Sequence, residues 1–143
     1  MDCLAVKEVS LEELSLVQSF YRSVGYSHSI TGTDRVVVAT LKNQVVGVGR
    51  IAVEEGTFVL RGMQVDRSML KRGIGKSILL ELDRIVGGKE CYCIPHGWLE
   101  KFYSIIGFKK IVTEEAPLHL QKRFLDYLPQ YPQLIIMKKS AKK

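Results

Sequence analysis

A basic, glycine-containing loop in the middle of the chain is the segment best suited to bind a charged ligand. A strand-like apolar segment ends at Val65, and a helical apolar pattern begins after Ser77. Between them, Gly73 and Gly75 leave room for a ligand at the backbone, and the positive end of the following helix favours an anion. We therefore expect a phosphate group to bind here, on the loop formed by Lys71, Arg72, Gly73, Ile74, Gly75, Lys76 and Ser77.

Two well-known phosphate-binding loops are excluded by single positions. The mononucleotide-binding P-loop ends in Gly-Lys-Ser, as this loop does at Ser77, but the first glycine that it requires is replaced by Leu70. The dinucleotide-binding fingerprint needs a third glycine where this chain has Ile78. The loop is therefore of another kind, in which a basic residue precedes Gly-x-Gly at the start of a helix.

A second motif, Phe102-Tyr103 followed by Gly107-Phe108, lies further along the chain. Together with the basic Gly-x-Gly loop, it resembles the GCN5-related N-acetyltransferases, the GNAT family, whose members bind acetyl-coenzyme A (acetyl-CoA). The two motifs occur in the family's order, with room between them for one helix and one strand. The resemblance covers essentially the whole chain, because the order of the expected helices and strands is also similar.

The hydrophobic pattern changes between the two halves of the chain. Apolar stretches joined by short turns predict antiparallel strands in the first half, whereas helices and strands alternate after the loop. The pattern and the resemblance predict an α/β (α+β) fold of the acyl-CoA N-acyltransferase type, with a mixed, mostly antiparallel central sheet flanked by helices on both faces. Strands are expected at residues 4–6, 35–41, 45–53, 57–65, 91–94 and 133–137 and after Gly107, and helices at residues 10–25, 74–86, 98–105 and 117–128.

The resemblance also implies how the cofactor is held. Gly62 lies inside a predicted strand, where glycine often marks a bulge or a close backbone approach. In the family this strand bulges and separates from the next parallel strand, and the pantetheine arm binds in the opening. By this resemblance, main-chain groups of Met63, Gln64 and Val65 would bind the arm, and one freed amide would hold the thioester oxygen.

Tyr103 and His96 are the side chains expected near the reacting group. The matching tyrosine of the family usually protonates the leaving thiolate, so the resemblance makes Tyr103 the candidate general acid, with packing in a helix as the alternative. His96 stands where many family members carry an asparagine. It could contact the cofactor arm or act as a base, or it could be a solvated histidine at the start of a helix.

The residues around the acceptor are defined less sharply. In the family, the segment that contains Tyr21, Tyr26 and His28 overlies the acceptor, so these three are candidates for substrate contact. The strand before the loop carries Arg61 but no carboxylate that could serve as a general base. Glu54 borders a turn, where a solvated surface charge is the expected role.

Two functions are consistent with these motifs. The leading hypothesis, implied by the resemblance, is an acetyl-CoA-dependent N-acetyltransferase that moves an acetyl group to a primary amine by direct attack in a ternary complex. The alternative, which the lack of an obvious base favours, is a catalytically weak acyl-CoA-binding sensor or scaffold module. The acceptor is expected to be a small-molecule or peptide amine, and the few acidic residues near the expected cleft argue against a polycation.

The composition is that of one globular domain. The chain has 143 residues, of which 46% are hydrophobic and 25% are charged, and we expect a single N-acetyltransferase domain over residues 1–143 with a basic tail at residues 138–143. No apolar run reaches the ~18 residues that a membrane span needs. The first residues do not form a secretory signal. A cytoplasmic protein, monomeric or homodimeric, is therefore expected.

The net charge of +6 does not by itself indicate a nucleic-acid-binding protein. Four of the lysines fall in the terminal six residues, and the chain has neither zinc-finger spacings nor an RNA-binding aromatic motif. The basic bias instead suits a ligand that carries three phosphates. The cysteines Cys3, Cys91 and Cys93 form neither an even set nor a metal-binding pair, so we expect reduced thiols and no metal.

Overall fold

The apolar stretches in the first half of the chain form four antiparallel strands. In the computed structural model, which describes residues 3–142, they pair in chain order as β1 (Ala5–Glu8), β2 (Arg35–Leu41), β3 (Gln44–Glu54) and β4 (Thr57–Val65). Both tight hairpins turn through two residues of positive φ, Lys42 with Asn43 and Glu55 with Gly56. This turn geometry matches the natural twist of the strands, so it fixes their register.

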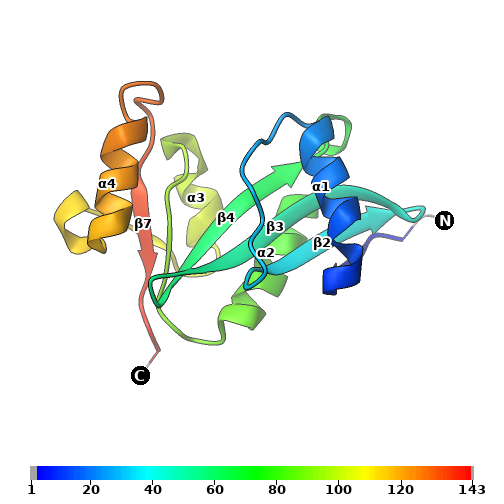
Figure 1. Ribbon diagram of the computed structural model, residues 1–143, viewed down its shortest axis with the longest axis horizontal. Coiled ribbons are helices and arrows are strands. Elements are labelled where there is room, and N and C mark those ends of the chain that lie inside the picture. The colour runs from blue at the N-terminus through cyan, green and yellow to red at the C-terminus, as the bar shows by residue number, and fades with distance from the viewer. Residues whose placement is uncertain (1–2, 143) are drawn as a thin grey trace.

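The second half of the chain extends the same sheet with three short strands. β5 (Cys91–Cys93) lies parallel to β4, β7 (Ile136–Lys139) lies antiparallel to β5, and β6 (Lys109–Ile111) pairs with β7 at the edge. The strand order is β1-β2-β3-β4-β5-β7-β6 (Figure 1). The mixed, mostly antiparallel sheet that the sequence predicts is confirmed.

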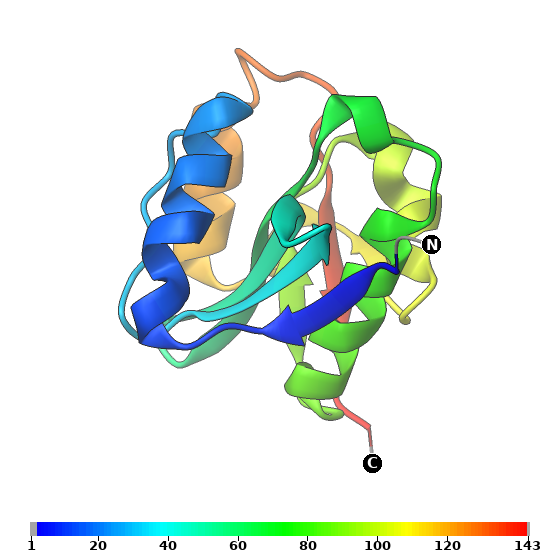
Figure 2. The same cartoon turned by 90° about the vertical axis from the view of Figure 1, so that its right-hand side faces the viewer.

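Helices cover both faces of this sheet, as expected. Figure 2 shows α1 (Leu14–Ser23) and α4 (Leu118–Tyr127) on one face, with α2 (Ile74–Val86) and α3 (Glu100–Ser104) on the other. Four short 3-10 turns complete the elements, at Leu11–Glu13, Arg67–Met69, Gly97–Leu99 and Thr113–Glu115. In the first of these, the Glu13 side chain accepts from the Ser10 amide at 3.2 Å.

The core fills the space between the sheet and these helices. On the α2 face, Ile78, Leu79 and Leu82 are fully buried against the strands. The helix lies so close to β3 that a Cβ added at Gly47 would come within 2.8 Å of the Ile78 side chain. On the opposite face, Val17 of α1 is fully buried in a second cluster. Apolar burial on both sides therefore holds the sheet in place.

The last strand differs from the expectation. It was expected at residues 133–137 but spans Ile136–Lys139, because Ile135 donates its amide to the Pro95 carbonyl and so belongs to the approach to the sheet. The basic tail is also shorter than expected, because Lys139 is buried in β7, where it pairs with Asp83 at 3.3 Å. Residues 1, 2 and 143, at the ends of the expected domain, lie outside the described residues.

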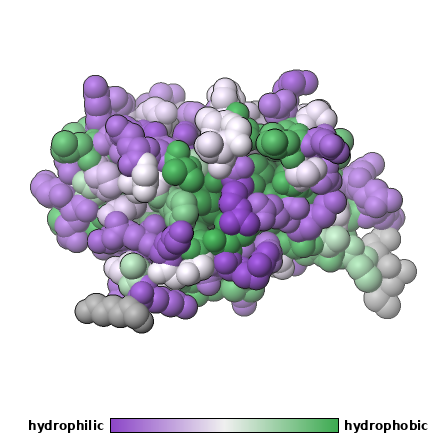
Figure 3. Space-filling model, turned by 60° about the horizontal axis from the view of Figure 1, so that its bottom comes forward, coloured by the Kyte–Doolittle hydropathy of each residue, from purple (hydrophilic) through white to green (hydrophobic). Residues whose placement is uncertain are grey.

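On the face shown in Figure 3, hydrophobic side chains are interspersed among hydrophilic ones. Across residues 3–142, no helix combines the length and the apolar character that a membrane crossing requires.

Candidate active site

The site is built where β4 separates from its parallel neighbour. β4 pairs with β5 through Phe58 with Cys91 and Val59 with Tyr92, and this ladder ends there. On its other side, β4 carries one extra residue opposite β3, because the register shifts between Arg61 and Gln64. Gly62 lies in this bulge with φ +65°, a conformation that glycine adopts without strain. The expected break in the ladder at Gly62 is confirmed.

A buried polar network lies directly under the bulge. The Tyr21 hydroxyl donates to the Gly62 carbonyl at 2.8 Å and accepts from Nη1 of Arg50 at 3.2 Å. Arg50 is fully buried and pairs through Nε with Asp34 at 3.1 Å. A Cβ added at Gly62 would lie 2.2 Å from Arg50 Nη1 and 2.3 Å from the Tyr21 hydroxyl. The network thus fixes the path of the strand at this point.

This network was not anticipated from the sequence. Tyr21 was a candidate for substrate contact, but it is 3% exposed and both its hydrogen bonds are internal. Burial is the main cause that raises the pKa of its hydroxyl, and the nearby Arg50 opposes this. A single arginine inside an otherwise apolar strand was the available signal, because a buried guanidinium requires a partner.

A cavity of about 610 Å³ occupies the opening between β4 and β5. Its wall comes from β4, from the chain that leaves β5, from α3, from the loop after α1, and from α4 with the segment that follows it. The structure brings six of the expected site residues together in this wall: Tyr26, His28, Met63, Gln64, His96 and Tyr103. It does not bring Val65 or the loop at residues 71–77 into the wall.

Tyr103 is 5% exposed and lies in α3, with its ring packed in the core. The rings of Phe102 and Phe108 meet it edge-on at centroid distances of 5.0 and 6.1 Å. Burial raises the pKa of its hydroxyl, which therefore keeps its proton at neutral pH. Within residues 3–142 the hydroxyl has no hydrogen-bond partner, although the residue reaches the cavity. The expected alternative of packing is therefore observed, and the residue also lies on the cavity wall.

His96 follows β5 and caps the 3-10 turn at Gly97–Leu99. Its ring stacks on Trp98 with 4.4 Å between the centroids and an interplanar angle of 2°. The Nδ1 atom is buried and has no hydrogen-bond partner among the described residues. An unpaired buried polar atom is costly, so this nitrogen is a polar group that the described residues leave unsatisfied.

The basic loop reaches α2 through Gly73, which has φ +77°. The first amides of α2 have no acceptor within the helix, so they are free to bind an anion. Ser77 is less free, because its hydroxyl donates to the Gly73 carbonyl at 3.0 Å. A Cβ at Gly75 would lie 3.3 Å from Phe102, so this end of α2 packs beside α3, the helix that carries Tyr103.

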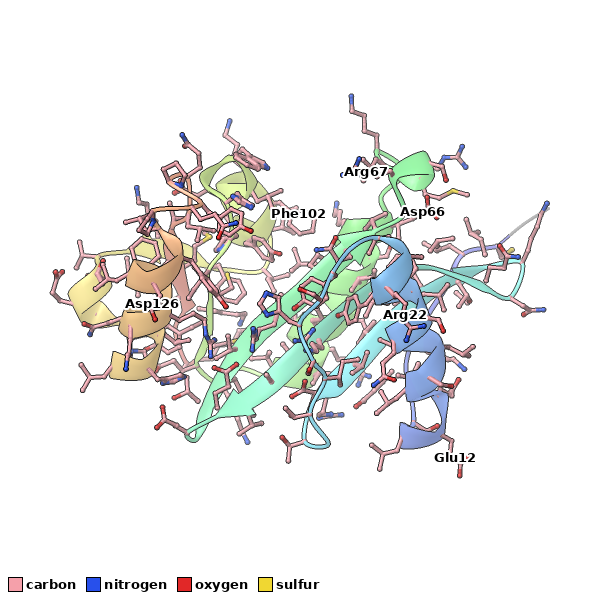
Figure 4. All side chains as sticks on the ribbon, turned by 45° about the horizontal axis from the view of Figure 1, so that its top comes forward. Glu12, Arg22, Asp66, Arg67, Phe102 and Asp126 are labelled. Atoms are coloured by element: carbon pink, nitrogen blue, oxygen red, sulfur yellow. The ribbon has the colours of Figure 1, made fainter. Side chains whose placement is uncertain are left out.

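The loop and the cavity therefore lie at the same end of β4. Figure 4 shows Asp66 and Arg67, which follow β4, along the same edge of the molecule as Phe102 of α3. The side chain of Asp66 caps the turn after the strand, since it accepts from the Ser68 amide at 2.9 Å. A ligand long enough to reach from the loop past α3 would enter the cavity between β4 and β5.

Two arginines face the cavity on the side away from the loop. Arg61 of β4 and Arg123 of α4 line the wall, and both pair with Glu54, at 3.1 and 2.7 Å. Glu54 was expected to be a solvated surface charge, and that expectation is wrong. Burial alone would raise its pKa, but the hydrogen bonds and charges of the two arginines lower it. His28 also lines this wall.

His28 and Tyr26 belong to the segment between α1 and β2. Their ring centroids lie 5.2 Å apart, and the ring centroid of His28 lies 6.3 Å from that of Tyr127. The segment therefore extends toward α4. Although His28 is exposed, partial burial of its imidazole lowers its pKa, and the charges of Arg61, Arg50 and Arg123 lower it further. Its imidazole is therefore neutral at pH 7 and able to accept a proton.

Comparisons with known proteins agree with this architecture. No protein-family model matches the sequence, and no curated protein sequence matches it. An acetyltransferase of the GNAT family from Streptococcus pneumoniae superposes with a TM-score of 0.71 at 11% identity, over 98% of this chain and 100% of that one. Aminoglycoside 6'-N-acetyltransferase complexed with coenzyme A gives a TM-score of 0.67 at 14% identity, over 97% and 98%.

A larger protein is also similar in structure. N-acetylglutamate synthase from Neisseria gonorrhoeae, complexed with coenzyme A and N-acetyl-glutamate, gives a TM-score of 0.71 at 11% identity. The match covers 99% of this chain but 36% of that one, so the chain corresponds to about a third of the larger protein. At these identities the likeness establishes the fold. The chain has the fold of the GNAT acetyltransferases, and the resemblance indicated by the two motifs is confirmed at that level.

Proposed function

We propose that the protein is an acetyl-CoA-dependent N-acetyltransferase that acetylates a primary amine by direct attack in a ternary complex. The observation that carries the proposal is the separation of β4 from β5 after Val59, with the bulge at Gly62 and a cavity in the opening. An extended ligand arm can add to the freed edge of β4 as a strand does. The same wall carries Tyr103 and His96, the side chains expected near the reacting group.

In this proposal, one ligand spans both parts of the site. The amides at the start of α2 and the side chains of Lys71, Arg72 and Lys76 bind the pyrophosphate of coenzyme A. Main-chain groups of β4 at Met63, Gln64 and Val65 bind the pantetheine arm. The thioester then lies in the cavity, near Tyr103.

The reaction joins the amine nitrogen to the acetyl carbon and breaks the bond from that carbon to sulfur. As the nitrogen attacks, the carbonyl oxygen gains negative charge, and an amide of the bulge at Met63 would stabilise it. The leaving thiolate takes a proton from the Tyr103 hydroxyl. Because burial raises the pKa of Tyr103, the phenol is a weak acid, and its proton can move only as negative charge builds up on the sulfur during cleavage of the carbon–sulfur bond.

The amine must lose a proton before or during attack. Among the described residues that line the cavity there is no aspartate or glutamate. The imidazole of His28 is the proposed acceptor, directly or through water, because burial and nearby arginines lower its pKa and keep it neutral. The same positive charges would also lower the pKa of a bound ammonium, which eases its deprotonation.

A catalytically weak acyl-CoA-binding sensor or scaffold is the second candidate. The absence of a carboxylate from the described cavity wall favours it, since many amine acylations use one as a base. In that case coenzyme A would bind the same loop and the same strand edge, but acetyl transfer would be slow with every amine.

Two measurements on the full chain test these candidates. Calorimetric titration with acetyl-CoA should show binding at a single site, and a free-thiol assay with a panel of amines should show acceptor-dependent release of coenzyme A. Binding together with thiol release establishes the enzyme, whereas binding without release from any amine establishes the sensor. Absence of acetyl-CoA binding would contradict both.

A further inference from the structure

The charge of the cavity differs from what a cationic acceptor requires. Of the charged side chains in its wall, Arg61 and Arg123 are basic, and the described wall contains no acidic residue. A cavity that bound a polyamine or a lysine-rich peptide would need carboxylates at this position, because an ammonium group taken out of water requires a counter-charge.

The two arginines are only partly neutralised by their protein partner. Both pair with the single carboxylate of Glu54, Arg61 through Nη1 at 3.1 Å and Arg123 through Nη2 at 2.7 Å. Two guanidinium groups thus share one negative charge. Each guanidinium has five N–H donors, and one nitrogen from each is engaged here, so further donors are available to a ligand.

The pKa of His28 reflects the same excess of positive charge. It lies on the cavity wall, and its pKa is lowered by burial first and then by Arg61, Arg50 and Arg123. Arg50 is paired with Asp34 below the bulge, so the remaining positive field comes from the side of the cavity that Arg61 and Arg123 form. Geometry and electrostatics therefore agree.

We infer that the acceptor carries a carboxylate or phosphate group close to its primary amine, and that Arg61 and Arg123 bind this anionic group. The inference rests on the proposed acetyl transfer and names the substrate class of the same site. Guanidinium groups suit this role, because their planar donors match both carboxylate and phosphate oxygens.

The position of Arg61 places the anion site and the bulge in one cavity. Arg61 precedes Gly62 on β4, and its guanidinium, at the end of a long side chain, meets Glu54 on the side of the cavity where Arg123 lies. An acceptor with its anionic group on the arginines and its amine at the bulge therefore fits within this single cavity. Amino acids, acidic peptide N-termini and small amino phosphates carry both groups, whereas polyamines carry no anionic group.

Matched ligand pairs test the inference without requiring turnover. Calorimetry on the full chain should compare N-acetylglycine and N-acetylglutamate with their carboxamides, and phosphoethanolamine with ethanolamine. Charge-assisted hydrogen bonds predict that each anionic ligand binds roughly 10–100-fold more tightly than its neutral counterpart. The carboxylate and phosphate arms distinguish the two sources of the anion. Equal affinity within every pair would overturn the inference.

Variants separate recognition from a structural role. Arg61→Gln and Arg123→Gln should each weaken binding of the anionic ligands about tenfold or more while leaving acetyl-CoA affinity unchanged. Arg22→Gln removes an equal charge from an exposed position on α1 and should change neither. If the two cavity variants weaken neutral and anionic ligands equally, the arginines serve only the ion pair with Glu54 and the inference is wrong.

The thiol-release assay distinguishes failure of this inference from failure of the proposed function. Glycine and glutamate should be acetylated faster than their α-amides, although the amide's amine is the less basic and more easily deprotonated of each pair. Arginine-dependent anion binding without thiol release would retain the anion site and refute acetyl transfer. Thiol release with equal rates for acids and amides would retain the enzyme and refute the anionic acceptor.

Discussion

The two halves of β4 belong to one continuous strand but lie in opposite environments. At Phe58 and Val59 the strand is paired on both sides, and Val59 is 1% exposed within the core. From Leu60 onward its β5 side faces a cavity instead of a strand. A strand that loses one partner gains free amides and carbonyls, so one element supplies both the core of the fold and the main-chain groups of the site.

The chain that leaves β5 explains why the pairing stops. Beyond Cys93, the Pro95 carbonyl accepts from the Ile135 amide, and His96 forms an isolated bridge with Leu134. Proline has no amide hydrogen to donate to a ladder. The segment therefore follows the approach to β7 and diverges from β4, which opens the cavity.

The largest expected effect concerns the open half, where Tyr103 contributes the only proposed acid. Tyr103→Phe should lower turnover by about 10²–10⁴-fold with little change in acetyl-CoA affinity, because the ring still packs between Phe102 and Phe108. Single-turnover and steady-state thiol release measure the effect.

Tyr92→Phe is the matched control for this change. It removes a phenol from β5, where the hydroxyl bonds Glu90 in a cluster outside the cavity, and should leave turnover unchanged. Near-normal turnover of Tyr103→Phe with the best acceptor would assign Tyr103 to the core and the proton to water.

The next largest effect is expected at the bulge, where the paired and open halves of β4 meet. Gly62→Ala places a methyl group at positive φ against Arg50 and Tyr21, so it should reduce the free energy of unfolding by about 3 kcal/mol. Gly56→Ala has a similar φ of +77° with no atom near the added Cβ, and should cost about 1 kcal/mol from strain alone. Equal losses in urea unfolding would show that the network under the bulge tolerates displacement.

The sequence predicted the elements that depend on a local pattern, including β4 and the helix after the loop. The ranges 57–65 and 74–86 agree with the structure because apolar period, turn residues and glycines mark them within the segment itself. The separation at Gly62 followed from a family resemblance and from the cost of glycine in a strand.

The sequence did not reveal contacts between distant segments. Arg123 and Glu54 are 69 residues apart in the chain, and Arg50 meets Asp34 across 16. No local sequence pattern indicates such partners. Glu54 lies beside a turn, so the sequence predicts a solvated charge, and only the position of α4 against the hairpin shows its ion pairs. The end of the chain was misplaced for a related reason, since Ile135 bonds Pro95 in place of a sheet neighbour.

A smaller effect is expected in the loop, where a substitution should change the affinity for acetyl-CoA without changing the chemistry at β4. Gly73→Asp places a negative charge beside the proposed pyrophosphate, and should weaken acetyl-CoA binding roughly tenfold or more relative to Gly73→Asn. Asparagine and aspartate have the same shape and both tolerate the φ of +77° found there, so the pair isolates charge. Equal affinities by calorimetry would remove the phosphate from this loop.

The smallest effect concerns the ion pairs that join the hairpin at the start of β4 to its open half. Glu54 precedes the strand and binds Arg61 and Arg123. Although burial raises its pKa, the two arginines lower it overall below its ordinary value of 4.5. A lowered folded-state pKa means that the pairs stabilise the fold above the unfolded-state pKa and lose that contribution as pH falls through the folded-state pKa.

Glu54→Gln, which has the shape of the protonated acid, should therefore lower the free energy of unfolding by about 1 kcal/mol at about pH 7 and by progressively less below about pH 4. Glu12→Gln, an exposed carboxylate without an ion pair among the described residues, should leave stability unchanged at both values. Urea unfolding across this pH range measures the difference. If the loss of unfolding free energy for Glu54→Gln does not change with pH, the Glu54 carboxylate contributes packing and not charge. The paired and open halves of β4 would then be held together by the backbone alone.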